Sequence, residues 1–260
     1  MSKTLVKVLA FINVLAFIWV VVVNFLAVKL PIWWMSTWEL SDLYPNLFTP
    51  TGLTFSIWWL IYLLLTIFLV YQIVDLFSKK TKNITKKIWI WFLMSCLTNI
   101  WRIFARHYRL VFLSVIVIVL FFITLVIISK KVEIWKKLWN RKDKFFVQVP
   151  FSVYLWRLSV AVIANTSALL VYLWRNMFWL SDVFWTIVVI IVATIITLIN
   201  LYKKYDIIFS LVVIWAFLWI ILKRLDIDPI YAKSIIWTVW VCIVMISTWI
   251  GLSFEKWKKN

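Results

Sequence analysis

The chain of 260 residues holds very few glycines, histidines and cysteines. Its two glycines, Gly52 and Gly251, stand far apart, so it can form neither a glycine-rich phosphate-binding loop nor a GxxxG helix-packing motif. With His107 as its one histidine it has no HExxH zinc motif, and no apolar run carries paired carboxylates. Cys96 and Cys242 lie in apolar runs without metal-ligand spacing, which indicates inert buried thiols rather than a disulfide framework. We find no signature of an enzyme and assign no catalytic or metal-ligating residue.

Acidic charge is scarce too, which leaves a formal net charge of +18. Such an excess of basic over acidic residues can indicate nucleic-acid binding. However, no stretch of this chain is long and polar enough to form a basic soluble domain. We therefore expect no nucleic-acid partner. Lysine-rich loops on the cytoplasmic side of a membrane protein explain the charge more simply.

What the chain has in abundance is apolar sequence. Hydrophobic residues make up 65% of it and the mean hydropathy is +1.00. Its apolar runs recur along the whole length, and each approaches the roughly 20 residues that a helix needs to cross a bilayer. A β-barrel would instead show alternating segments of about 10 residues. The sequence predicts an all-α membrane protein whose surroundings are the lipid bilayer, with eight spans near 5–28, 54–77, 88–105, 110–129, 150–173, 180–201, 206–223 and 231–253.

The placement of lysine and arginine predicts the orientation of these spans. With eight spans, 19 of the 28 basic residues fall at the two termini and in every second loop, all on one side. Because cytoplasmic loops are enriched in lysine and arginine, we expect both termini in the cytoplasm of a multi-pass cell-membrane protein. The loop between the first two spans then lies outside.

This outer loop and the helix after it are rich in aromatic residues. Trp33, Trp34 and Trp38 cluster in the loop, and Trp58 and Tyr62 follow four residues apart in the second span. Tryptophan often marks a membrane interface, but three in a proline-containing loop are better interpreted as a lid over a pocket.

Polar residues on the third span share one helical face. Ser95, Asn99, Arg102 and Arg106 are spaced by four, three and four residues. Asn99 could either hydrogen-bond a neighbouring helix or contact a ligand, and Arg102 could either reach toward the interface or pair with an acidic group. We interpret His107 as an interfacial histidine, although histidine is also a haem ligand.

The fifth span has a similar face, formed by Tyr154, Arg157, Ala161 and Asn165. Our topology places Arg157 in the inner half of the membrane and Asn165 in the outer half. Arg157 either pairs with a carbonyl or carboxylate such as Asp75, or serves as the counter-ion of an acidic ligand.

Four pieces in order carry a resemblance to a known family. They are a Pro/Trp-rich loop, Trp then Tyr in the second span, an Asn/Trp pair in the third, and a Pro-aromatic start with a later Asn in the fifth. The residues are Pro31, Trp33, Trp34 and Pro50; Trp58 and Tyr62; Asn99 and Trp101; and Pro150, Tyr154, Trp156, Ala161 and Asn165. Over residues 5–175 the chain thus resembles the TspO/MBR family of tryptophan-rich sensory proteins, relatives of the mitochondrial translocator protein.

The resemblance implies a five-helix bundle whose outer loop caps a pocket for porphyrins, other tetrapyrroles or sterols. We expect a TspO-like domain at 1–175 and a three-helix extension at 176–260 with almost no buried polar groups. In the family, tryptophan tends to stand where this chain has Arg102 and Arg157, with Trp101 and Trp156 shifted by one. That difference indicates a more cationic pocket.

We expect a membrane sensor or carrier that binds a hydrophobic tetrapyrrole; a transporter of an anionic metabolite and a structural membrane component are the alternatives. No cofactor is required, porphyrin or haem would be the ligand, and a homodimer is left open. The predicted ligand-binding residues are Trp33, Trp34, Trp38, Trp58, Tyr62, Asn99, Trp101, Arg102, Tyr154, Trp156, Arg157, Ala161 and Asn165.

Overall fold

Long apolar helices form the fold. The computed structural model describes residues 2–29, 47, 57–77, 84–132, 144–173, 182–204, 207–227 and 229–259. Within these ranges eight helices are long and apolar enough to cross a membrane. They are α1 (Lys3–Lys29), α3 (Ile57–Phe77), α4 (Ile84–His107), α5 (Val111–Lys131), α7 (Val149–Leu173), α8 (Asp182–Lys204), α9 (Ile207–Ile227) and α10 (Lys233–Lys259), with the short π-helical turn η3 (Lys144–Gln148) before α7. The predicted all-α membrane fold of five plus three helices is confirmed.

Most helices extend beyond the apolar runs that predicted them. Helix α4 begins at Ile84 rather than near residue 88, and α10 continues to Lys259 rather than ending near residue 253. Lysine and glutamate at these ends are good helix formers, and no glycine or proline interrupts them. An apolar run therefore shows where a helix crosses the membrane, whereas the helix itself ends further out.

A tight turn joins α4 to α5. Arg109 adopts the left-handed conformation with φ of 56°. The N–H of Arg109 donates to the carbonyl of Arg106, and the N–H of Leu110 donates to the carbonyl of Ala105, both at 2.9 Å. These two bonds define a Schellman motif, which usually has glycine at the left-handed position. The turn lets α5 fold back directly along α4.

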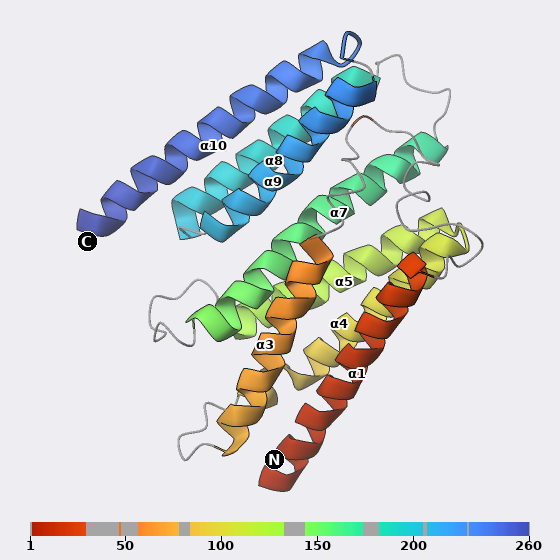
Figure 1. Cartoon of the computed structure of the whole chain (residues 1–260), viewed down its shortest axis with the longest axis vertical. Helices are drawn as coiled ribbons and strands as arrows, with labels where there is room; N and C mark the ends of the chain where they lie inside the picture. The colour runs from red at the N-terminus through yellow and green to blue at the C-terminus, as the bar shows by residue number, and fades with distance from the viewer. Residues whose placement is uncertain are drawn as a thin grey trace. The chain divides into compact units, whose positions relative to one another are not determined.

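The helices fall into two units. The first comprises residues 1–40 and 57–162, and the second comprises residues 41–56 and 163–260. In the first unit, α4 packs against both α1 and α5, and α3 packs against α1 (Figure 1). In the second unit, α8, α9 and α10 pack against one another (Figure 1). The predicted domain boundary after residue 175 stays a prediction.

Buried polar side chains occur in α8 and α9, contrary to our expectation of almost none in the three-helix extension. The set comprises Thr186, Thr194, Thr197, Asn200, Ser210 and Arg224. Thr194 and Thr197 donate their hydroxyl protons to the carbonyls of Ile190 and Ala193, at 2.8 and 2.7 Å. Because such bonds stay within one helix, threonine is inexpensive inside a span and does not interrupt an apolar run.

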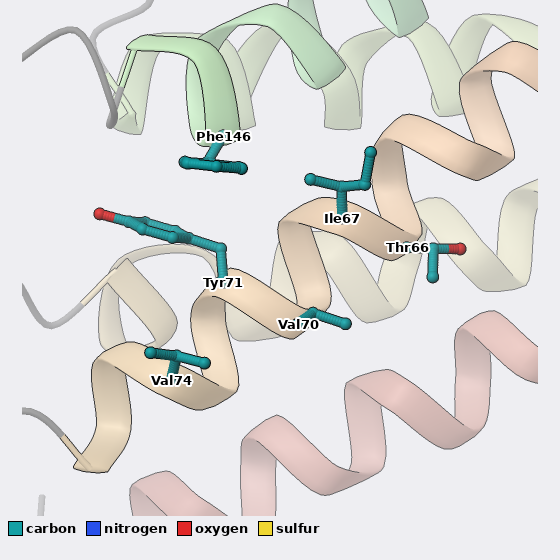
Figure 2. Close-up of a pocket in the computed structure, with 6 residues that line it drawn as sticks. All are labelled: Thr66, Ile67, Val70, Tyr71, Val74 and Phe146. Carbon is teal, nitrogen blue, oxygen red and sulfur yellow. The ribbon is translucent and has the colours of Figure 1, made fainter.

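An apolar groove follows the outer side of α3 (Figure 2). Its volume is about 320 Å³, and its lining residues are Thr66, Ile67, Val70, Tyr71, Val74 and Phe146. The rings of Tyr71 and Phe146 stack at 5.0 Å with an interplanar angle of 11°, which fixes η3 against α3 (Figure 2). Val70 and Val74 are exposed on the surface of the unit, so in a bilayer this groove faces acyl chains. It contains none of the predicted ligand-binding residues.

Candidate functional site

Aromatic rings from three helices meet around Trp58, in the first turn of α3. Its ring centroid lies 6.1 Å from that of Tyr62 on the same helix and 6.1 Å from that of Tyr154 on α7. Phe121 of α5 then packs edge-to-face on Tyr154 at 5.4 Å. The Trp58–Tyr154 and Phe121–Tyr154 pairs are edge-to-face, a geometry that favours one relative ring orientation. We call the group of Trp58, Tyr62 and Tyr154 the Trp58 cluster.

A chain of hydrogen bonds crosses the bundle beside the Trp58 cluster. The Asn24 amide on α1 donates to Oδ1 of Asn99 on α4 at 2.9 Å. The Asn99 amide in turn donates to the hydroxyl of Tyr154 on α7, also at 2.9 Å. Asn99 thus acts as donor and acceptor in the interior of the unit, and it connects three helices. Of the two alternatives that the sequence left open for Asn99, its contact with neighbouring helices is therefore present.

Two arginines flank the same tryptophan. The guanidinium carbon of Arg102 lies 5.2 Å from the centroid of the Trp58 ring, and that of Arg157 lies 5.6 Å from it. Both arginines are buried. A cation over an indole ring gains about 0.5–2 kcal/mol, which offsets part of the roughly 3 kcal/mol that burying an arginine in a membrane costs. The Trp58 cluster is therefore a region of concentrated positive charge.

Two donors in this region have no hydrogen-bond partner among the residues that the structure describes. They are Nε of Arg102 and the hydroxyl of Tyr62, and both atoms are inaccessible. A buried donor without an acceptor costs about 1–3 kcal/mol, and more for a charged group. An acceptor supplied from outside the chain would satisfy both groups.

The structure gathers six of the predicted ligand-binding residues in one place: Trp58, Tyr62, Asn99, Arg102, Tyr154 and Arg157. Trp156, Ala161 and Asn165 are also buried, further along or around α7. Trp101 is not brought to the cluster, because 59% of its surface is exposed on the outside of α4. Trp33, Trp34 and Trp38 lie outside the described residues.

The predicted depth of Arg157 and its pairing with Asp75 are wrong. Arg157 reaches the first turn of α3 at Trp58, whereas Asp75 lies nearly five turns further along α3, roughly 25 Å away. The reason is the offset between the two helices. Phe151, close to the start of α7, already packs on Phe68 at the middle of α3, 4.8 Å between centroids. Counting residues from the start of each span does not reveal this offset.

Residues that the sequence analysis missed support the cluster from α1 and α5. Phe17 packs edge-to-face on Tyr62 at 6.2 Å, and Asn24 begins the hydrogen-bond chain. A sequence signal for α1 exists, because Asn13 and Asn24 are the amides of an apolar span and lie three helical turns apart on one face. Phe121 has no comparable signal among the many apolar residues of α5.

His107 is buried at the C-terminal end of α4, and its position at a membrane interface stays a prediction. Its Nδ1 lies 2.8 Å from the carbonyl of Ile103, one turn back on α4, and donates to it. The described part of the chain brings together no group of three or more histidine, cysteine or acidic side chains that could hold a metal ion. Cys96 and Cys242 are both buried and free.

A protein-family model described as TSPO-like protein matches residues 10–252. The chain belongs to the TSPO-like family. The match continues through α8 and α9 into α10, so it extends beyond the range of 5–175 over which the resemblance was recognised. No curated protein and no solved structure matches the chain.

Its membership of the TSPO-like family and its eight membrane-length helices in the described residues identify the chain as an integral, multi-pass membrane protein. Within this TSPO-like protein, the Trp58 cluster, the Asn24–Asn99–Tyr154 chain and the two arginines all lie inside the matched range. The site therefore belongs to the family portion of the chain.

Proposed function

We propose that this TSPO-like protein binds a flat hydrophobic ligand of the tetrapyrrole type through acidic substituents on that ligand. The observation that carries the proposal is the position of the Arg102 and Arg157 guanidinium groups at one indole ring, within 5.2 and 5.6 Å of its centroid. An aromatic macrocycle stacks on indole and phenol rings, and a carboxylate accepts the paired N–H donors of arginine.

Each part of the site has a separate role in this proposal. Trp58 and Tyr62 stack on the ligand, and Arg102 pairs with a carboxylate that also satisfies its Nε. Asn99 keeps Tyr154 in place through its hydrogen bond, so it orients the site. Trp156 and Ala161 would line its continuation along α7, and the loop with Trp33, Trp34 and Trp38 would act as a lid.

The proposed setting is a cell membrane with both termini in the cytoplasm. The even number of membrane-length helices and the lysines near the N-terminal end of α1 and the C-terminal end of α5 support this orientation. The Trp58 end of the first unit would then face the outside.

Titration of purified protein with protoporphyrin and with haem tests the proposal. The absorbance of the porphyrin should be followed, because tryptophan fluorescence would change with the substitutions themselves. We expect Trp58→Ala and Arg102→Ala each to weaken binding about tenfold, which equals 1.4 kcal/mol. Trp19→Leu is the matched control, since Trp19 is exposed on α1 away from the ring contacts of the cluster.

Two results would count against the proposal in different ways. Unchanged affinity in both site variants would show that the ligand binds elsewhere. Failure of the unmodified protein to bind either compound would exclude the ligand class while leaving the cationic site intact.

Transport of an anionic metabolite is the second candidate, and the same pair of buried arginines favours it. In this case the cluster would be a binding step on a path across the membrane. Flux of a small dicarboxylate into proteoliposomes should then collapse in Arg157→Leu. Binding of porphyrin without any flux would favour the first candidate.

A further inference from the structure

Four phenylalanine rings pack against one another in a layer inside the first unit, next to the Trp58 cluster. Phe68 and Phe151 are 4.8 Å apart, and Phe92 lies 5.9 Å from Phe68 and 6.2 Å from Phe151. Phe17 completes the layer at 6.4 Å from Phe92. We call these rings the phenylalanine layer. Since Phe17 also contacts Tyr62, the layer follows the Trp58 cluster directly.

Two buried amides lie beyond the phenylalanine layer, on the side of the N-terminus. Asn13 is one turn from Phe17 on α1, is 1% exposed, and has no hydrogen-bond partner for either Oδ1 or Nδ2 among the described residues. Gln72 is one turn from Phe68 on α3 and is 2% exposed. Its Nε2 donates to the hydroxyl of Thr85 on α4 at 2.8 Å, but its Oε1 has no partner in the described part of the chain.

Contacts on either side of Asn13 and Gln72 place the two residues at similar depth along α1 and α3. On one side of them Phe17 packs on Tyr62, and on the other side Lys7 lies over the ring of Phe77 at 4.8 Å. The two helices therefore run antiparallel along this stretch. Asn13 falls between Lys7 and Phe17, and Gln72 falls between Tyr62 and Phe77.

Three atoms of these two amides lack a hydrogen-bond partner among the described residues, and they lie at similar depth in the first unit. A buried polar group without a partner costs about 1–3 kcal/mol in proteins, and no bulk water reaches it within a bilayer. The groups comprise two acceptors, on Asn13 and Gln72, and one donor, on Asn13. Water offers two donors and two acceptors, so it matches this set, and buried waters typically make about three such bonds.

We propose that Asn13, Gln72 and Thr85 form a second site that holds water on the N-terminal side of the phenylalanine layer. All three side chains are uncharged, so the site suits a neutral ligand, unlike the cationic Trp58 cluster across the layer. The first unit thus has a cationic aromatic site and a neutral hydrated site, separated by phenylalanine rings. This inference does not depend on the identity of the ligand at Trp58.

Cysteine reactivity measures whether the site is hydrated. In the full chain with Cys96→Ala and Cys242→Ala, single cysteines are introduced as Asn13→Cys and Gln72→Cys. Methyl methanethiosulfonate is the probe, because it is small and uncharged and reacts only with thiolate, which an apolar surrounding suppresses. Val20→Cys on α1 and Ile61→Cys on α3 are matched controls, since both positions are buried on the other side of the layer.

We expect the Asn13→Cys and Gln72→Cys thiols to react at least about tenfold faster than both controls, because water at the site allows the thiol to ionise. Equal rates at all four positions would overturn the proposal. The rates are compared in folded protein, as judged by a single peak in size-exclusion chromatography.

A stability measurement keeps the proposal testable if a cysteine variant misfolds. If no water contacts the buried Asn13 amide, Asn13→Leu would remove an unsatisfied polar group and raise the melting temperature. If the Asn13 amide binds water, the substitution expels that water and leaves Gln72 Oε1 without a hydrogen-bond donor. The melting temperature then stays the same or falls. A clear rise would therefore contradict the site.

Discussion

The Arg102 guanidinium carbon lies 5.2 Å from the centroid of the Trp58 ring, which joins the C-terminal third of α4 to the first turn of α3. Arg157 approaches the same ring from α7. Two like charges at one indole repel each other, and this repulsion is strong where the dielectric constant is low. The arrangement becomes favourable when an anion lies between them, which is why we attribute ligand binding to this place.

The hydrogen bond from Asn99 to Tyr154 should couple α4 to α7. In a double-mutant cycle of Asn99→Ala and Tyr154→Phe, we expect a coupling of about 0.6 kcal/mol, and at most about 1.7 kcal/mol, the range of such bonds in membranes. The free energy of unfolding in mixed micelles provides the measurement.

Ser95→Ala paired with Tyr154→Phe is the control for this cycle. The hydroxyl of Ser95 donates to the carbonyl of Phe92 within its own helix, at 2.7 Å, so it should show no coupling to Tyr154. Coupling of equal size in both cycles would mean that the effect comes from general loosening of α4.

The structure and the sequence prediction differ in where they place the side chain of Trp101. The Asn/Trp pattern placed it among the ligand-binding residues, but it is exposed toward the outside of the unit. We expect Trp101→Leu to leave porphyrin affinity within about twofold of the unmodified protein, because a side chain facing lipid contributes little to a site inside the bundle. A tenfold loss of porphyrin affinity would show that Trp101 contacts the ligand and that the binding site extends beyond the Trp58 cluster.

Topology mapping tests the predicted orientation. Reporter fusions at the N-terminus and C-terminus should both be active in the cytoplasm, because the eight helices bring the chain back to its starting side. A cysteine at position 38 in the first loop should react with an impermeant reagent added outside intact cells. Opposite locations of the two termini would mean that one of the helices does not cross the membrane.

Much of the fold could be predicted from the sequence, because membrane helices must be long and apolar. The gathering of Asn99, Arg102 and Tyr154 was also predictable, since polar residues on one face of a span must turn inward. The prediction failed where neighbouring helices are offset. Arg157 reaches Trp58 because α7 begins opposite the middle of α3, and only the packing of Phe151 on Phe68 reveals this.

The other failures have equally physical reasons. Trp101 and Arg102 are adjacent on α4, so the helical rotation of about 100° sends one outward and the other inward, and a motif shifted by one residue cannot say which. Asn24 was overlooked because a single amide hardly lowers the hydropathy of α1, yet it begins the hydrogen-bond chain.

Discrimination between protoporphyrin and its dimethyl ester tests the central claim most directly. The two compounds have the same macrocycle, and only the first offers carboxylates to Arg102 and Arg157. We expect the diacid to bind about tenfold more tightly than the ester, with this ratio falling toward one in Arg102→Leu and partly recovering in Arg102→Lys, which restores the charge but not the paired donors. Equal affinity for diacid and ester in the unmodified protein, or a ratio unchanged in Arg102→Leu, would contradict the account.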